Sequence, residues 1–179
     1  MKKVVITYGL ISGVIVSGLM GITVAFSSGH PDFNHSYLLG YGTMLLAFSM
    51  VFVGIKMFRD KCNGGVVSFG KAFRVGFFIA LIASTMYVAA WAIEYNYLFP
   101  DFMEKYVSKI VSDLKTAGAA QATIDAKVNE MARMREMYKN RLFFILLTYA
   151  EILPLGLLVS LICALILKKG NQQQPSVGQ

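Results

Sequence analysis

Residues 142–167 read LFFILLTYAEILPLGLLVSLICALIL, an apolar stretch that contains one charged residue, Glu151, three residues before Pro154. At about 1.5 Å of rise per residue, a helix over this stretch is long enough to cross the hydrocarbon layer of a membrane, which is about 30 Å thick. The stretch ends at Lys168 and Lys169, whose charges favour the aqueous interface. It therefore predicts a membrane-spanning helix.

Three earlier runs have the same character, and the composition of the whole chain agrees with them. Of the 179 residues, 56% are hydrophobic and only 15% are charged, and the mean hydropathy is +0.57. The apolar residues form long blocks, whereas the helices of soluble proteins carry apolar stripes. We expect an all-α fold with residues 1–169 as a single membrane domain and a disordered polar tail at 170–179. The predicted four-helix bundle has transmembrane helices at 4–26, 38–58, 72–95 and 142–167.

The first apolar run could instead be a cleaved signal peptide, because Lys2 and Lys3 precede it. Its apolar part is, however, longer than the about 7–15 residues of a signal-peptide core. No convincing cleavage site with small residues follows it. We therefore interpret this run as a helix that is retained in the protein.

Lysine and arginine are distributed unevenly over the segments between the predicted helices. The first connection, residues 27–37, contains neither, whereas the connection between the second and third helices is rich in both. Because cytoplasmic loops carry the excess of these residues, we expect both termini in the cytoplasm. The net charge of +7 then lies at rims near anionic lipid and does not indicate nucleic-acid binding. The basic residues concerned are Lys2, Lys3, Lys56, Arg59, Lys61, Lys71, Arg74, Lys168 and Lys169.

Residues 100–140 have the pattern of a soluble helical hairpin. Apolar residues recur about every four positions over 102–114 and again over 124–138, with Gly118 at the turn between them. We expect an αα-hairpin outside the membrane, on the periplasmic side. Its apolar stripes would most simply seal against each other, and a groove for a partner is the second possibility. Before the hairpin, an aromatic belt at the outer membrane surface is predicted at Trp91, Tyr95 and Tyr97.

Small residues recur at intervals of four in three of the predicted membrane helices. A row of this kind lets another backbone approach closely, either within the bundle or from a second molecule. We favour packing within the bundle and keep dimerisation as the alternative. The rows are Gly9, Gly13, Ser17 and Gly21; Gly76, Ala80 and Ser84; and Gly156, Ser160 and Ala164.

Two motifs resemble metal or nucleotide sites but lack residues that such sites require. His30, Asp32 and His35 have neither the regular spacing nor the fourth ligand of a zinc site. Residues 65–72 match the glycines and lysine of a phosphate-binding loop, but Ala72 replaces the Ser or Thr that would bind Mg²⁺. We therefore expect no metal, no cofactor, no catalytic residues and a protein that is not an enzyme.

Glu151 and Pro154 are the candidate functional residues within the membrane. An ionised carboxylate near mid-bilayer costs about 3 kcal/mol, so the neutral acid is favoured unless a cation or a water-filled cavity is present. Pro154 removes one helical hydrogen-bond donor and leaves the carbonyl of Ala150 without its usual partner. Glu151 fits two roles, a neutral acid hydrogen-bonded to a neighbouring helix or a proton or ion relay. Its candidate hydrogen-bond partners are Tyr41, Thr43, Ser84 and Tyr87.

Five groups of residues occur together along the chain and carry a resemblance to a known family. They are LLGY at 38–41 with LLAF at 45–48, FVGIK at 52–56 with RD at 59–60, GG at 64–65 with SFGKAF at 68–73, PDFMEKY at 100–106, and EI at 151–152 with Pro154 and GL at 156–157. With them the chain, over residues 1 to about 169, resembles the bacterial membrane-protein family called domain of unknown function 4199, typical of Bacteroidota. The resemblance implies a location in the bacterial inner membrane and carries no activity.

Two hypotheses for the function follow from the sequence. The first is a non-enzymatic protein whose outer hairpin and small-residue faces mediate assembly, with itself as a homo-oligomer or with another membrane protein. The alternative is a small transporter, or a proton- or ion-coupled membrane component, that works through Glu151. The lipid bilayer is the one partner that the sequence identifies.

Overall fold

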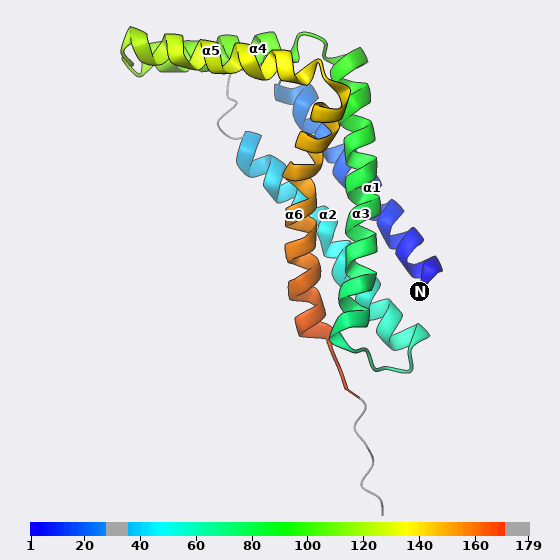
Figure 1. The fold of residues 1–179 in the computed structure, drawn as a ribbon. Helices are drawn as coiled ribbons and strands as arrows, with labels where there is room; N and C mark the ends of the chain where they lie inside the picture. Colours follow the sequence, from blue (N-terminus) through cyan, green and yellow to red (C-terminus); the bar gives the residue numbers. More distant parts are fainter. Residues whose placement is uncertain (28–35, 171–179) are drawn as a thin grey trace, which may run out of the picture.

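The computed structural model describes residues 1–27 and 36–170, and this part of the chain is helical (Figure 1). The expected all-α fold is therefore confirmed. The predictions that concern His30, Asp32 and His35, and those for the tail at 171–179, lie outside the described residues. The α-helices are α1 (Lys2–Ser27), α2 (Ser36–Met57), α3 (Phe69–Ile93), α4 (Phe102–Thr116), α5 (Gln121–Tyr138) and α6 (Arg141–Leu167), and α2 and α3 continue into the π-helical segments η2 (Phe58–Cys62) and η3 (Glu94–Leu98).

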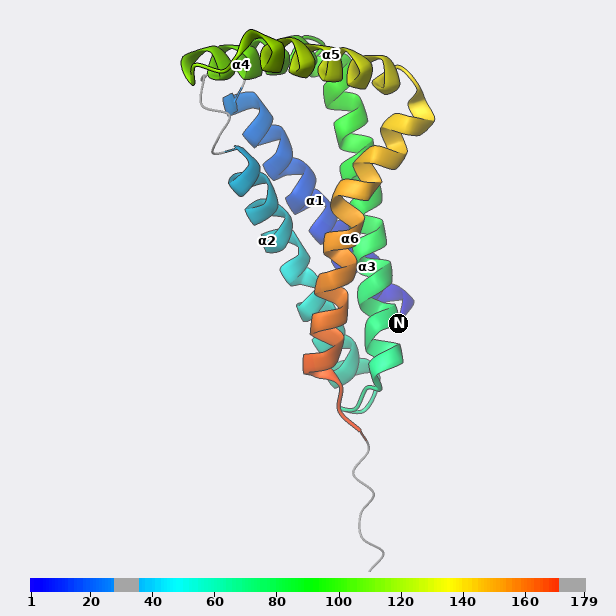
Figure 2. The same ribbon diagram turned by 60° about the vertical axis from the view of Figure 1, so that its left-hand side comes forward.

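Four helices in the described part of the chain are long and apolar enough to cross a membrane, as predicted. The candidate spans cover Lys2–Ala25, Gly40–Cys62, Phe69–Leu98 and Arg141–Leu167. Between the third and fourth spans, α4 and α5 form the expected hairpin, which lies across one end of the bundle (Figures 1 and 2). The protein is thus a multi-pass membrane protein with a helical cover on one end.

Large apolar side chains fill the middle of the bundle. Val16 of α1, Phe48 of α2, Ile79 of α3 and Ile152 of α6 are all buried, with at most 1% of their surface exposed. A hydrogen bond between helices adds to this packing, because the Ser12 hydroxyl donates to a backbone carbonyl of α2 at 2.8 Å. Each of the four spans therefore contributes to one shared core.

The predicted rows of small residues lie at contacts between helices of the same chain. A Cβ atom added at Gly9 would come within 2.8 Å of the Cβ of Ile82, so the row of α1 faces α3. A Cβ atom at Gly76 would lie 3.0 Å from the Cβ of Ser160, which joins the rows of α3 and α6. Of the other members, Gly13, Gly21 and Gly156 also approach neighbouring helices, Ala80, Ser84 and Ala164 are buried, and Ser17 is half-buried.

The end of the bundle opposite the hairpin is tied together by backbone hydrogen bonds. Val67 and Lys169 exchange two of them, with N–O distances of 3.0 and 2.9 Å. The turn that leads to Val67 needs left-handed backbone at two positions, which glycine adopts readily: Gly64 has a φ of 65° and Gly65 a φ of 79°. These contacts hold the connection between the second and third spans against the C-terminal end of α6.

Candidate functional site

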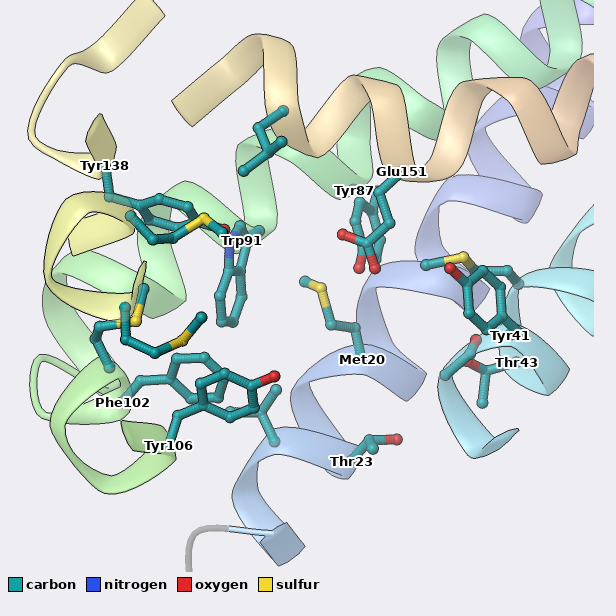
Figure 3. A pocket seen from close by; sticks show the side chains of 17 residues that line it. Met20, Thr23, Tyr41, Thr43, Tyr87, Trp91, Phe102, Tyr106, Tyr138 and Glu151 are labelled. Atoms are coloured by element: carbon teal, nitrogen blue, oxygen red, sulfur yellow. The ribbon is translucent and has the colours of Figure 1, made fainter. Parts of the chain in front are cut away.

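A pocket of about 350 Å³ lies beneath the hairpin. Its seventeen lining residues come from all six α-helices (Figure 3). Figure 2 shows α2 diverging from α6 toward the hairpin, and the pocket lies on that side of the bundle. The packed core lies below it, and α4 and α5 cover it. The fold therefore places a cavity between helices at the hairpin end of the protein.

Glu151 provides the charged group of this pocket. Figure 3 shows its carboxylate directed into the cavity beside Tyr87, with Tyr41 and Thr43 facing it from α2. The Glu151 side chain is exposed, whereas its neighbour Ile152 is fully buried on the other face of α6. Among the described residues, no hydrogen bond or ion pair joins the Glu151 carboxylate to another group.

The predicted hydrogen-bond partners of Glu151 are only partly brought together. Tyr41, Thr43 and Tyr87 line the same pocket, whereas Ser84 is fully buried elsewhere in the bundle. The hydroxyl of Thr43 donates instead to the Gly40 carbonyl in its own helix, at 2.7 Å. In the described part of the chain, the expected hydrogen bond from Glu151 to a neighbouring helix is absent, because the carboxylate faces a cavity.

Pro154 acts through the backbone and does not line the pocket. It lies inside α6, which remains helical on both sides of it. The part of α6 nearest the hairpin leans away from the line of the rest of the helix in Figure 2. A proline inside a helix is a usual cause of such a bend. The part of α6 before Pro154 carries Leu147 and Glu151, the two residues of this helix that line the pocket.

Aromatic rings and thioethers line the part of the pocket nearest the hairpin. Trp91 packs edge-to-face on Phe102, with ring centroids 5.1 Å apart, and Phe102 stacks on Tyr106 at 6.1 Å. Methionine side chains adapt to irregular shapes, which suits a binding surface. Five methionines contribute to the lining: Met20, Met44, Met103, Met131 and Met134.

A second group of rings holds the base of the hairpin to the spans. Tyr95, Tyr138 and Phe144 pack on one another, with centroids 5.3–5.6 Å apart. Burial raises the pKa of the Tyr138 phenol, and the charge of an ionised Glu151 acts in the same direction. Tyr138 therefore stays neutral at physiological pH. The cluster joins η3, α5 and α6 at the base of the hairpin.

The three residues of the predicted aromatic belt differ in their exposure. Tyr97 is 80% exposed, as a belt residue would be. Trp91 and Tyr95 are partly buried and pack against rings of the hairpin and of α6. The hairpin folds back over the end of the third span and covers part of these two rings, and their position at the membrane interface stays a prediction.

The apolar stripes of the hairpin also differ in part from the prediction. Phe102 and Tyr106 of α4, and Met131 and Met134 of α5, line the pocket, so these positions face the bundle as well as each other. Farther along α5, Val128 is 39% exposed. The stripes therefore serve mainly to cover the cavity at the bundle end. The side-by-side placement of Phe102, Met103 and Tyr106 on one helical face was the sequence signal that could have indicated this.

Glu94 is a second acid near the pocket, but it does not line it. A Cβ atom at Gly21 of α1 would lie 2.9 Å from its Oε1 atom, so its carboxylate rests against that helix. Its Oε2 atom is buried without a hydrogen-bond partner among the described residues. The described residues also contain no group of three or more His, Cys, Asp or Glu side chains placed to hold a metal ion.

Comparison with known proteins places the chain in a family. A family model described as "Protein of unknown function (DUF4199)" matches residues 7–169, which include the pocket and the hairpin and nearly all of the four spans. No curated protein matches the chain, and no solved structure does. Because the model covers most of the sequence, the chain belongs to the DUF4199 family of proteins of unknown function.

Proposed function

We propose that this protein is a non-enzymatic binding protein of the bacterial inner membrane, and that it takes a small amphiphilic molecule into the pocket beneath the hairpin. The observation that carries the proposal is a cavity of about 350 Å³ with an aromatic and thioether lining and one carboxylate open to it. Small-molecule pockets typically have volumes of about 300–1,000 Å³, a mostly apolar lining and a few polar groups. In helical bundles they lie between the helices, as this one does.

Of the two hypotheses from the sequence, the geometry favours the small transporter or coupled membrane component that uses Glu151, because the Glu151 side chain points into a cavity large enough for a ligand. Binding in this pocket is the first step that a small transporter or a ligand-coupled component would need. The assembly hypothesis stays a prediction. The rows of small residues, which were one of its two supports beside the outer hairpin, make contacts within the chain and therefore do not argue for it.

Binding is tested with two brominated aromatic probes of the same shape, (4-bromobenzyl)trimethylammonium and its uncharged carbon isostere. Bromine quenches tryptophan fluorescence, and Trp91, the single tryptophan of the chain, lines the pocket. We expect saturable quenching of Trp91 by at least one probe. Gly40→Phe should remove it, since Gly40 lines the pocket and an added Cβ meets nothing within 4 Å.

Gly42→Phe is the matched control for this experiment. Gly42 lies on the same helix, also has open space at its Cβ position, and does not line the pocket. Quenching should therefore saturate in this variant as in the unmodified protein. If neither probe quenches Trp91 saturably, or if Gly40→Phe and Gly42→Phe respond alike, the pocket is not a binding site and the proposal fails.

The proposed orientation places the hairpin in the periplasm and the opposite end of the bundle in the cytoplasm. The end of α2 with Lys56, the segment η2 with Arg59 and Lys61, and the C-terminal end of α6 all lie away from the hairpin (Figure 1). Basic residues concentrated at one end favour the cytoplasmic side for that end. The distribution of charge therefore supports the same orientation as the sequence pattern does.

The orientation predicts opposite thiol accessibility at the two ends of the molecule. Cys62 is exposed at the end away from the hairpin, and Ala117 is exposed at the hairpin turn. In intact spheroplasts, a membrane-impermeant maleimide should label the Ala117→Cys variant at the hairpin and leave Cys62 unlabelled until the membrane is permeabilised. The Cys62→Ser form of the same variant identifies which thiol reacts. Labelling of Cys62 in intact spheroplasts would contradict the orientation.

A further inference from the structure

We infer that the ligand of this pocket is a hydrophobic organic cation, an amine or quaternary ammonium compound with an apolar body. The inference rests on the proposed function, because it names the class of molecule that the pocket binds. Three observations support it: the single negative charge of the lining, the placement of the rings and thioethers, and the position of the second acid, Glu94, outside the lining.

The charge of the lining favours a cation. Glu151 is the one charged side chain among the pocket-lining residues that the structure describes, which include no Lys, Arg or His. A carboxylate in an apolar cavity is stabilised by a positive partner and is costly to leave without one. A bound ammonium group supplies that partner, whereas an anion is repelled and an uncharged molecule leaves the carboxylate unpaired.

The two ends of the pocket differ in chemistry. In Figure 3, Glu151 lies with Tyr41 and Thr43 toward one end, and Trp91, Phe102 and Tyr106 lie toward the other. The first end offers a carboxylate and hydroxyl groups, and the second offers aromatic rings beneath the hairpin. A molecule with a cationic head and an apolar body therefore fits with its head at Glu151 and its body against the rings.

The lining at the apolar end also favours this class of ligand over a purely aliphatic one. The faces of tryptophan, tyrosine and phenylalanine rings attract cations and also pack against apolar groups. The methionine side chains, which include Met20 near the centre of Figure 3, adapt to apolar bodies of different shape. We therefore expect the site to accept a range of apolar bodies and to discriminate by charge.

Glu94 does not take part in this recognition. Its carboxylate rests against Gly21 of α1, and it does not line the cavity. One carboxylate therefore faces the ligand, which fits a monovalent cation. A single substitution at Glu151 can consequently remove the discrimination by charge while leaving the shape of the cavity unchanged.

The test compares the two brominated probes in lipid nanodiscs of phosphatidylcholine, whose headgroups carry no net charge and do not concentrate cations at the surface. For the unmodified protein, we expect the concentration of half-maximal Trp91 quenching to be at least about tenfold lower for the trimethylammonium probe than for its uncharged isostere. Glu151→Gln keeps the shape of the side chain and removes its charge, so the preference for the trimethylammonium probe should decrease sharply. Glu151→Asp keeps the charge and should retain the preference, which separates a charge effect from a loss of folding.

The outcomes distinguish this inference from the function on which it rests. Equal affinity for both probes in the unmodified protein, or a preference unchanged by Glu151→Gln, overturns the inference of a cationic ligand. In that case, loss of saturable quenching in Gly40→Phe would still support a binding pocket. Absence of saturable quenching by either probe overturns both. Tighter binding of the uncharged isostere than of the cation likewise excludes a cation site.

Discussion

Gly156→Leu is expected to lower the free energy of unfolding of the bundle by about 3 kcal/mol or more. A Cβ atom at this position would already lie 2.8 Å from the ring of Phe48 and 2.9 Å from the Cβ of Ala80. Both neighbours are fully buried, so neither can move without disturbing the rest of the core. The added side chain would push α6 away from α2 and α3 at the level where the spans share their core.

Thermal unfolding of the purified protein in mild detergent measures this effect. Gly42→Leu is the matched control, because it adds the same side chain to a membrane helix at a position with nothing within 4 Å of the Cβ atom. We expect a Tm close to that of the unmodified protein for Gly42→Leu, and a large decrease or a failure to purify as a monodisperse species for Gly156→Leu. Equal Tm values for the two variants would show that α6 does not pack against α2 as described.

Phe48→Ala is expected to lower the free energy of unfolding by about 2–4 kcal/mol. Phe48 is fully buried at the same contact, and removing its ring leaves a cavity lined by three helices. In a soluble protein, burying a side chain is favourable partly because its apolar surface leaves water, and a truncated side chain loses that part of the free energy. Lipid is as apolar as the core, so in the membrane the loss of packing accounts for most of the cost.

The same reasoning predicts that the two core substitutions compensate each other. In the variant that combines Phe48→Ala with Gly156→Leu, the leucine side chain enters part of the space that the ring leaves. The decrease in Tm should then be smaller than the sum of the single decreases, as measured by a double-mutant cycle. Phe78→Ala serves as the control for ring removal. Phe78 is 39% exposed, so its replacement should change the Tm little. Additive decreases would argue against direct contact between Phe48 and Gly156.

The candidate site could be predicted from the sequence only in part, as Glu151 and three of the polar residues that line the pocket with it, Tyr41, Thr43 and Tyr87. A carboxylate inside an apolar helix is visible in the sequence, and its cost in hydrocarbon marks it as a candidate. Its aromatic and thioether surroundings are not visible in the sequence, because the pocket is assembled from residues far apart in the chain, such as Met20, Trp91 and Met131. The role in ligand binding proposed for Glu151 therefore depends on the cavity, and the cavity exists only because the spans and the hairpin pack together.

The position and length of each helix can be predicted from the sequence, because they depend on the residues of that segment alone. Whether a segment spans the membrane depends on its own hydropathy and length, and the turn at Gly118, with a φ of 69°, depends on glycine itself. The four spans and the hairpin between the third and fourth could thus be predicted, and the structure confirms them. The family resemblance agrees with a match over residues 7–169.

Rows of small residues marked a contact face on three of the spans in the sequence, but which of the large apolar side chains turn inward was decided by the tertiary structure. In a soluble protein the buried face is marked by apolar residues, but in a membrane the lipid-facing side of a helix is equally apolar, so no contrast in hydropathy separates buried from lipid-facing large side chains. Leu142, which is 65% exposed, and Phe144, which is buried, are indistinguishable by hydropathy. The contacts of Trp91 and Tyr95 with rings of the hairpin and of α6 likewise join segments that are far apart in the sequence. The sequence by itself thus determined what lies in the membrane, and long-range packing determined the pocket.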